Sequence, residues 1–250
     1  MNNNAIMITG ANGAIGSILV EEYLKRGFKV FALVHKNRQR IDLLQAKYIE
    51  NLVCKQCNLA NLAEVNSVFA KLNNEYGFIP NKMIHTSAIR SSDSKILTET
   101  DPELWYSIVN MNIFGCYNLL RNLLVHYQEN GGGKVVIIGS NISRTGLKNG
   151  SAYAVAKGAL TNFVRTIALE YGPDNIMINL VSPGAVNADQ SHFTKEYQAF
   201  RADYFAKELL NTPLRRLVDP LDIYHSCDYL LSDNNGSITG EEIFITGGKL

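Results

Sequence analysis

Three segments at the start of the chain constrain its fold more than any others. The apolar, β-branched run Ala5–Thr9 predicts a strand, and Ser17–Arg26 has the periodicity of a helix. Glycines between them allow a tight turn, close approach of a pyrophosphate to the main chain, and close packing of the helix on the sheet. The order strand, glycine turn, helix therefore predicts a dinucleotide-binding α/β unit. The expected cofactor contacts in the turn are Gly10, Asn12, Gly13, Ile15 and Gly16.

Strand and helix patterns alternate along the rest of the chain. Apolar runs predict strands at Lys29–Val34, Leu52–Cys57, Lys82–Thr86, Lys134–Ile138 and Met177–Val181. Helical patterns occupy Gln39–Ile49, Ala63–Tyr76, Pro102–Gln128 and Ala152–Tyr171. Such alternation predicts an α/β fold, a Rossmann-type doubly wound parallel sheet with helices on both faces. No linker, low-complexity tract or repeat divides residues 1–250, which predicts a single domain.

Composition and charge argue against several classes of protein. The chain has 46% hydrophobic residues and a formal net charge of +1, so neither nucleic acid nor an anionic membrane is an expected partner. No apolar run approaches the ~18 residues of a membrane span, and the polar start lacks the features of a secretory signal, so we expect a cytoplasmic location. Cys54 and Cys57 form a CxxC pair inside a predicted strand, and the five histidines show no ligand spacing. We expect no metal site.

The residues after the predicted strands are candidates for binding the cofactor, because ligands of such sheets lie beyond the carboxyl ends of the strands. After the second strand the chain has His35, Lys36 and Arg38 where an acid would bind a ribose 2′-OH. This basic cluster favours NADP(H) over NAD(H), although a solvated basic turn remains an alternative. The third and fourth predicted strands add the candidates Asn58, Leu59, Thr86, Ser87 and Ala88.

Four polar side chains are candidates for chemistry. Tyr153 and Lys157 are four apart in a helical run and project from one face, so the ammonium favours the phenolate and lowers the tyrosine pKa. The same spacing is also common on ordinary helices. Ser140 follows the fifth strand, and Asn112 lies in the apolar stretch Ile108–Leu120. A buried asparagine needs a hydrogen bond, either to neighbouring backbone or to a water or lysine of an active site.

Taken together, these motifs resemble the short-chain dehydrogenase/reductase family in its single-domain branch of about 250 residues. The resemblance covers the whole chain. It adds Pro183 and Gly184 after the sixth strand and the glycine-rich ending Ile238–Gly248 to the motifs already described.

The resemblance implies a role for each matching residue. Tyr153 exchanges a proton with the substrate oxygen, and Ser140 hydrogen-bonds the same oxygen. Lys157 holds the nicotinamide ribose and lowers the tyrosine pKa, while Asn112 anchors a water that links Lys157 to solvent. Further cofactor contacts are expected from Pro183, Gly184 and Val186, as well as from Tyr153 and Lys157 themselves.

Several positions depart from the family pattern. The glycine turn is TGxxGxxG, the spacing more usual in longer epimerase-like relatives, and it lacks the basic residue that NADP-preferring members often carry before the central glycine. Asn58 stands in place of an acid. The segment His85–Ala88 replaces Asn-Asn-Ala-Gly, and Ala188 replaces a threonine.

These features favour an NAD(P)-dependent oxidoreductase that interconverts a secondary alcohol and a ketone, similar to 3-oxoacyl reductases, with NADP slightly favoured. The alternatives are a non-catalytic dinucleotide-binding sensor or scaffold and a nucleotide-sugar epimerase or dehydratase. By resemblance, residues 184–216 form an insertion that covers a small-molecule substrate. Its aromatic residues, which also suit a packed amphipathic helix, are Phe193, Tyr197, Phe200, Tyr204 and Phe205. The resemblance also predicts a homotetramer or homodimer paired through the long helices.

Overall fold

The computed structural model describes residues 4–90, 94–189 and 195–249. Ser91 and Asp93, which the sequence suggests as candidates for the substrate pocket, and Phe193 of the expected insertion fall outside the described residues, as do the side chains of Tyr197 and Phe200.

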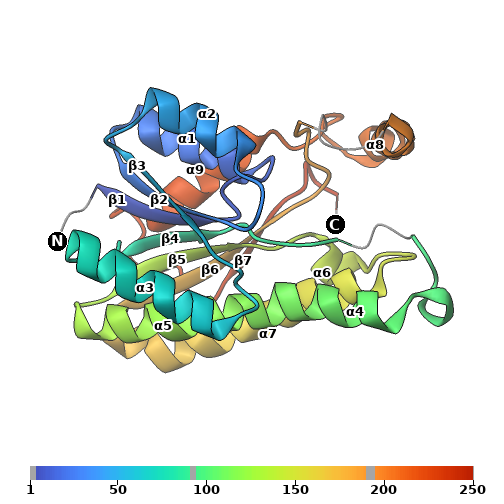
Figure 1. Ribbon diagram of the computed structural model, residues 1–250. Helices are drawn as coiled ribbons and strands as arrows, with labels where there is room; N and C mark the ends of the chain where they lie inside the picture. Colours follow the sequence, from blue (N-terminus) through green and yellow to red (C-terminus); the bar gives the residue numbers. More distant parts are fainter. Residues whose placement is uncertain (1–3, 91–93, 190–194, 250) are drawn as a thin grey trace.

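A seven-stranded parallel sheet forms the centre of the molecule (Figure 1), with the strand order β3-β2-β1-β4-β5-β6-β7. The strands are β1 Ala5–Thr9, β2 Lys29–Val34, β3 Leu52–Gln56, β4 Lys82–His85, β5 Gly133–Ile138, β6 Ile176–Pro183 and β7 Glu242–Ile245. Every neighbouring pair runs parallel. The order reverses between β1 and β4, and the cofactor site of a doubly wound sheet lies at such a switch.

Helices cover both faces of the sheet, as predicted. One layer contains α1 Gly16–Lys25, α2 Gln39–Lys47 and α9 Pro220–Leu231, and the other contains α3 Leu62–Tyr76, α5 Gly115–Glu129 and α7 Ser151–Tyr171 (Figure 1). The shorter elements are α4 Pro102–Val109, α6 Ile142–Thr145, η1 Leu97–Glu99 and η3 Gly172–Asp174. Helix α8, Lys195–Asn211, lies beyond the carboxyl ends of the strands, apart from both layers.

The apolar strands explain this layering, because alternate side chains of one strand enter opposite cores. Met7 packs with α3, α5 and α7, whereas its neighbours Ile6 and Ile8 pack with α1 and α9. All three are fully buried.

Most predicted boundaries agree with the structure within one or two residues. The prediction for the third strand was wrong by one residue, because β3 ends at Gln56 and Cys57 follows it.

The two cysteines of the CxxC pair, Cys54 and Cys57, are free thiols. Within the expected insertion, residues Lys195–Asn211 form helix α8.

The predicted helix Pro102–Gln128 has an unexpected interruption. Helices α4 and α5 are separated by a π-helical turn, η2 Asn110–Phe114, with Asn112 at its centre. A π turn inserts one residue into the hydrogen-bond ladder, and such turns are frequent at functional sites. Helix periodicity cannot reveal it, because the apolar pattern continues on both sides.

Within the described ranges, no helix has the length and apolar character needed to cross a membrane.

Candidate active site

The glycine turn packs against the end of β4 so closely that Gly10 and Gly16 have no space for a side chain. Gly10 has a φ of +64°, and a Cβ there would lie 2.6 Å from Thr86 Oγ1 and 2.7 Å from the Ser87 nitrogen. A Cβ on Gly16, the first residue of α1, would overlap the Gly10 carbonyl oxygen. Gly13 is exposed, and its N–H donates to that carbonyl at 2.8 Å. The turn thus has a bare outer surface at a helix N-terminus, which fits a pyrophosphate.

Gly10→Ala is expected to lower both stability and cofactor affinity, because the new methyl group would displace the end of β4. We expect a loss of about 2–4 kcal/mol of unfolding free energy, measured by urea denaturation. Gly27→Ala is a matched control: Gly27 also has positive φ (+77°), but a Cβ there would meet no described atom within 4 Å. If the two variants lost equal stability, close packing of the turn would not be the cause.

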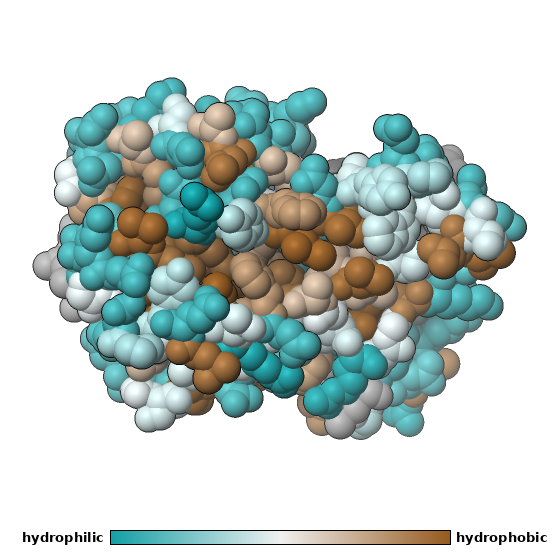
Figure 2. Space-filling view, turned by 90° about the horizontal axis from the view of Figure 1, so that it is seen from below, coloured by the Kyte–Doolittle hydropathy of each residue, from teal (hydrophilic) through white to brown (hydrophobic). Residues whose placement is uncertain are grey.

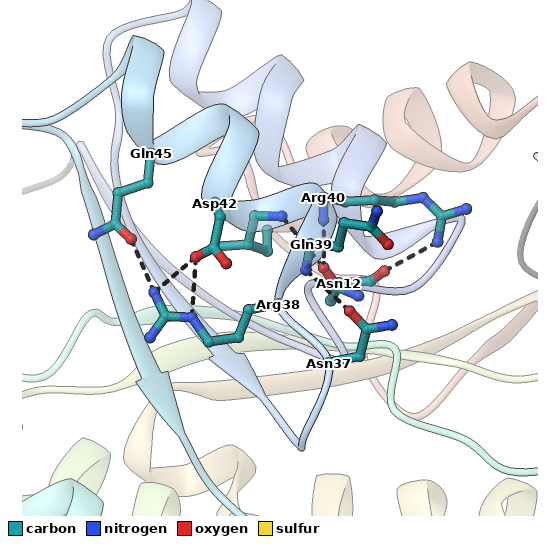
Figure 3. Close-up of polar contacts among 8 residues, drawn as sticks. Asn12, Asn37, Arg38, Gln39, Arg40, Asp42 and Gln45 are labelled. Atoms are coloured by element: carbon teal, nitrogen blue, oxygen red, sulfur yellow. Dashed lines mark hydrogen bonds and ion pairs between the residues drawn. The ribbon is translucent and has the colours of Figure 1, made fainter.

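Asn12 ties the glycine turn to α2 (Figure 3). Its Oδ1 accepts hydrogen bonds from the backbone N–H groups of Arg40, at 2.8 Å, and Ile41, at 3.3 Å. Arg40 also donates to the Asn12 carbonyl at 3.3 Å and pairs with Asp189 after β6. The side-chain oxygen of this predicted cofactor contact is therefore used within the chain.

The basic residues after β2 differ in how they are held. The Arg38 guanidinium donates to Asp42 at 2.9 Å and to Gln45 at 3.1 Å (Figure 3). His35 and Lys36 are exposed. An anion at this place could bind Lys36 directly, but it would compete with Asp42 for Arg38.

The predicted contacts after β3 and β4 lie at the same edge of the sheet. Asn58 Oδ1 accepts from the Ala60 N–H at 3.2 Å, and Leu59 is buried with its carbonyl bonded to Asn118. Thr86 Oγ1 donates to the Thr9 carbonyl at 2.8 Å. Of the remaining pair, Ser87 is half-buried and Ala88 is exposed, so both border the glycine turn at the surface.

The side chains of Tyr153 and Lys157 lie together on α7. The Lys157 Nζ is 5.7 Å from the centroid of the Tyr153 ring, and both residues are buried. The ammonium donates to the Ile138 carbonyl at 2.7 Å, at the end of β5. Ser140 follows two residues later, also buried, and its Oγ accepts from the Ile142 N–H at 3.4 Å.

A small apolar cluster fixes these groups relative to one another. The Tyr153 ring packs with Ala152, Ile108 and Ile142. Ile108 is one helical turn before Asn112, and Ile142 is two residues after Ser140. The cluster therefore connects α7 with α4, which leads into the π turn, and with α6, which follows β5.

Asn112 is 1% exposed, and its amide nitrogen bonds backbone carbonyls, as in the first of the two alternatives considered from the sequence. Its Nδ2 donates to the Ile108 carbonyl at 2.8 Å and to the Ile89 carbonyl at 2.9 Å. These two acceptors fix the orientation of the amide. Its Oδ1 is buried and has no hydrogen-bond partner among the residues described.

The end of β6 supplies the last predicted contacts. Pro183 is buried, and the Gly184 N–H donates to the Ile245 carbonyl of β7 at 2.9 Å. Val186 forms an isolated bridge to Val218. Together with the preceding residues, every predicted site residue thus lies at or near the carboxyl edge of the sheet.

Glu242, at the start of β7, joins three elements that carry site residues. Its carboxylate accepts hydrogen bonds from Ser143 of α6 at 2.7 Å, Thr161 of α7 at 2.8 Å and Ser182 of β6 at 2.6 Å. Thr161 is one turn beyond Lys157. This residue had no place in the sequence prediction. An acid at the start of an apolar run near the C-terminus was the only sequence feature that pointed to Glu242. Its hydrogen-bond partners are distant in sequence and could not be inferred from that feature.

Glu242→Gln is expected to lower the unfolding free energy by about 2 kcal/mol, because an amide nitrogen cannot accept from a hydroxyl and hydrogen bonds to a charged group are the stronger ones. Thermal and urea unfolding measure the loss. Glu241→Gln, at the exposed neighbouring residue, is the control and should leave stability unchanged. Equal stability of all three proteins would contradict a joining role for Glu242.

Two arginines lie near Tyr153 and α8. The Arg90 Cζ is 5.3 Å from the centroid of the Tyr153 ring. Burial and the negative charge of Glu208 raise the pKa of Tyr204 on α8, and the positive charges of Arg90 and Arg201 oppose that rise. Both guanidinium groups are therefore close to Tyr204, as is the carboxylate of Glu208. Arg90 was not among the candidate residues predicted from the sequence. Its position shortly after β4 was the only feature that could have suggested a place near the site.

The described part of the chain contains no group of three or more histidine, cysteine or acidic residues placed to hold a metal ion.

Comparison with known proteins identifies the family. A family model described as enoyl-(acyl carrier protein) reductase matches residues 10–249. The chain thus belongs to the short-chain dehydrogenase/reductase family, and it is an NAD(P)-dependent oxidoreductase. The acetoacetyl-CoA reductase of Cupriavidus necator is 26% identical, with 99% of this chain and 98% of that protein covered. The 3-oxoacyl-[acyl-carrier-protein] reductase FabG of Escherichia coli is 28% identical, with 97% and 95% covered.

Solved structures agree with this assignment. A 4-hydroxyisoleucine dehydrogenase in complex with NADH has a TM-score of 0.87 and 28% identity, and 98% of each chain is covered. ElxO with NADPH bound has a TM-score of 0.88 and 26% identity, with the same coverage.

Proposed function

We propose that this protein reduces the ketone of a 3-oxoacyl thioester to a secondary alcohol with NADPH or NADH. One observation carries the proposal: Tyr153, Lys157, Ser140 and Asn112 gather at the carboxyl edge of the sheet, beside a bare glycine turn. Residues from the ends of β1, β2, β3, β4 and β6 would hold the dinucleotide, which supplies the hydride when bound.

The protein's own residues handle the proton and the orientation of the substrate. Tyr153 donates its hydroxyl proton to the carbonyl oxygen as the carbonyl carbon is reduced, and Ser140 donates a hydrogen bond to that oxygen. The nearby Lys157 ammonium stabilises the negative charge left on the tyrosine. Burial of Tyr153, Ser140 and Lys157 keeps bulk solvent away from these groups and strengthens their interactions.

The choice of a thioester rests on the relatives and on two arginines near Tyr153 and α8. Acetoacetyl-CoA and 3-oxoacyl carrier-protein reductases cover nearly the whole chain. The carriers in both substrates bear phosphates, and Arg90 and Arg201 lie beside Tyr204. Guanidinium groups suit phosphate well.

A comparison of two thioesters tests this assignment. We expect 3-oxoacyl-CoA to be reduced with a higher kcat/KM than the same acyl group on uncharged N-acetylcysteamine. Arg90→Gln should reduce that ratio severalfold by raising KM for the CoA substrate alone. Reduction of neither thioester, with turnover of other hydroxy or keto compounds, would reject the substrate class. Cofactor binding without any turnover would favour the non-catalytic alternative.

For the cofactor we propose a slight preference for NADP(H), now resting on Lys36 and His35 because Arg38 is engaged by Asp42. Lys36→Ala is expected to lower kcat/KM for NADPH about tenfold and leave the value for NADH unchanged. Lys47→Ala, on the same helical layer at the end of α2, is the control. Equal losses for both cofactors, or none, would remove the NADP preference.

We also propose that the protein is a homotetramer or homodimer. Figure 2 views the face of α5 and α7 and shows apolar side chains near its centre. Residues on this side with exposed apolar side chains include Phe114, Val125, Val155 and Leu169. Pairing of two such faces would bury them. Light scattering at micromolar concentration tests the proposal, and a monomer would contradict it.

The cytoplasmic location and the single domain remain predictions. Cell fractionation tests the first, and limited proteolysis tests the second.

A further inference from the structure

His85 is a buried titratable residue that the proposed chemistry does not use. It is the last residue of β4 and is 2% exposed. In the sheet register it lies between Thr9 of β1 and Ile137 of β5. Its side chain shares the face of Met83, two residues earlier, which packs in the same core as Cys116 of α5. His85 therefore points toward the helical layer that carries the π turn and α7.

The hydrogen bond to Thr9 defines which ring nitrogen carries the proton. Thr9 Oγ1 and His85 Nδ1 are 2.8 Å apart, and Thr9 is fully buried. The structure shows no other partner for this hydroxyl in the ranges it describes, so the Thr9 O–H must donate to Nδ1. The proton of a neutral imidazole then lies on Nε2.

The ring stays neutral at physiological pH. Burial, aided by the positive charge of Lys157, lowers the pKa of His85 from 6.5 to about 3. His85 consequently offers Nε2–H as a hydrogen-bond donor and cannot take up a proton during turnover. Nε2 is buried without a partner among the described residues.

A matching acceptor lies on the facing helix. Asn112 Oδ1 is likewise buried without a described partner. Asn112 and Cys116 are four apart along η2 and α5, and therefore share a helix face. Burial raises the pKa of Cys116 to about 12, and the Lys157 charge opposes this rise, so the ammonium lies near that face as well as near His85.

We propose that His85 is a positioning residue of the active site: its Nε2–H and Asn112 Oδ1 together hold one water beside the Lys157 ammonium. The water accepts from Nε2–H and from Lys157, and it donates to Asn112 Oδ1. Each buried group is then satisfied, as buried polar groups are in proteins. The inference rests on the proposed function, since Asn112 and Lys157 belong to that site. His85 orients the water through which Lys157 communicates with solvent.

Within the part of the chain that the structure describes, two groups are seen to act on His85. Thr9 of β1 is its hydrogen-bond partner, and Lys157 of α7 is the charge that acts on its ring. Lys157 is the charged neighbour that faces the ring. A change in the pH profile of a His85 variant would therefore report on Lys157 and its water.

A crystal structure of the purified protein tests the placement directly. We expect an ordered water within hydrogen-bond distance of both His85 Nε2 and Asn112 Oδ1. Nitrogen NMR of labelled histidine should show a neutral ring protonated on Nε2, with a signal that moves in Asn112→Ala. Absence of the water, or protonation on Nδ1, would overturn the proposal. These readouts need no substrate, so they decide it even if the proposed reductase activity fails.

Kinetics of two variants test the consequence. His85→Phe keeps a ring but loses both nitrogens, and should lower kcat about fivefold to tenfold with KM unchanged, as expected for one lost hydrogen bond. His85→Gln places an amide N–H near the position of Nε2 and should recover most of kcat and the pH profile. Cys116→Ala, an equally buried neighbour, should leave kcat unchanged. A glutamine variant as slow as the phenylalanine variant, or equal losses from His85→Phe and Cys116→Ala, would overturn the role.

Discussion

Tyr153→Phe is expected to lower kcat for ketone reduction by about 10²–10⁴-fold while leaving the fold and the cofactor affinity intact. Phenylalanine keeps the ring that packs with Ile108, Ile142 and Ala152, but it has no proton to give to the carbonyl oxygen. Initial rates measure the loss, and fluorescence titration with the reduced dinucleotide measures the affinity. Loss of affinity together with activity would indicate damage to the site instead.

Tyr171→Phe is the matched control for this substitution. Tyr171 ends the same helix and packs, partly buried, against the large core, far along α7 from Lys157. Its variant should retain full activity. Activity of Tyr153→Phe equal to that of the control would remove Tyr153 from the reaction.

The second large effect concerns stability in acid. Because the pKa of His85 is about 3 in the folded chain and 6.5 in the absence of the fold, the unfolded chain binds a proton more readily between these pH values. The contribution of His85 to the unfolding free energy is fully present above pH 6.5 and is lost as the pH decreases toward 3. A pKa difference of this size corresponds to about 5 kcal/mol at the acid end.

Comparison with His85→Gln isolates this contribution from that of the carboxylates. Urea unfolding at a series of pH values between 6.5 and 3 should show a steeper loss for the wild-type chain than for the variant. The difference between their unfolding free energies should change by about 1.4 kcal/mol per pH unit. Parallel curves would show that the ring is not held neutral.

The sheet was predictable because its strands are buried on both faces. In the run Lys29–Val34 every residue after the first is apolar and buried, and a helix would expose part of such a run. The C-terminal elements were harder. Strand β7 is a short, half-buried edge strand, and neither it nor α9 was assigned from the sequence. The π turn was hidden because it changes backbone hydrogen bonds without changing the apolar pattern.

The candidate site was predictable only where its residues form local motifs. Tyr153 and Lys157 stand at helical spacing, and Ser140 marks the end of a strand, so their positions could be inferred. The hydrogen bonds of Glu242 and the Thr9–His85 pair join residues far apart in the chain, which no local pattern records. Arg38 illustrates the converse. Its position suggested a phosphate contact, whereas the structure pairs its guanidinium with Asp42 one turn away.

Transfer of hydrogen from the cofactor to the substrate tests the central claim most directly. Reduced dinucleotide carrying deuterium at the reactive carbon would be incubated with a 3-oxoacyl-CoA, and the product would be examined by mass spectrometry. We expect a 3-hydroxyacyl product with a single deuterium on the carbinol carbon, formed by the wild-type protein and not by Tyr153→Phe. Two results together would contradict a hydride-transferring reductase: unlabelled ketone recovered beside bound, unoxidised dinucleotide across a panel of ketones, and no reduction of the oxidised dinucleotide by the corresponding alcohols.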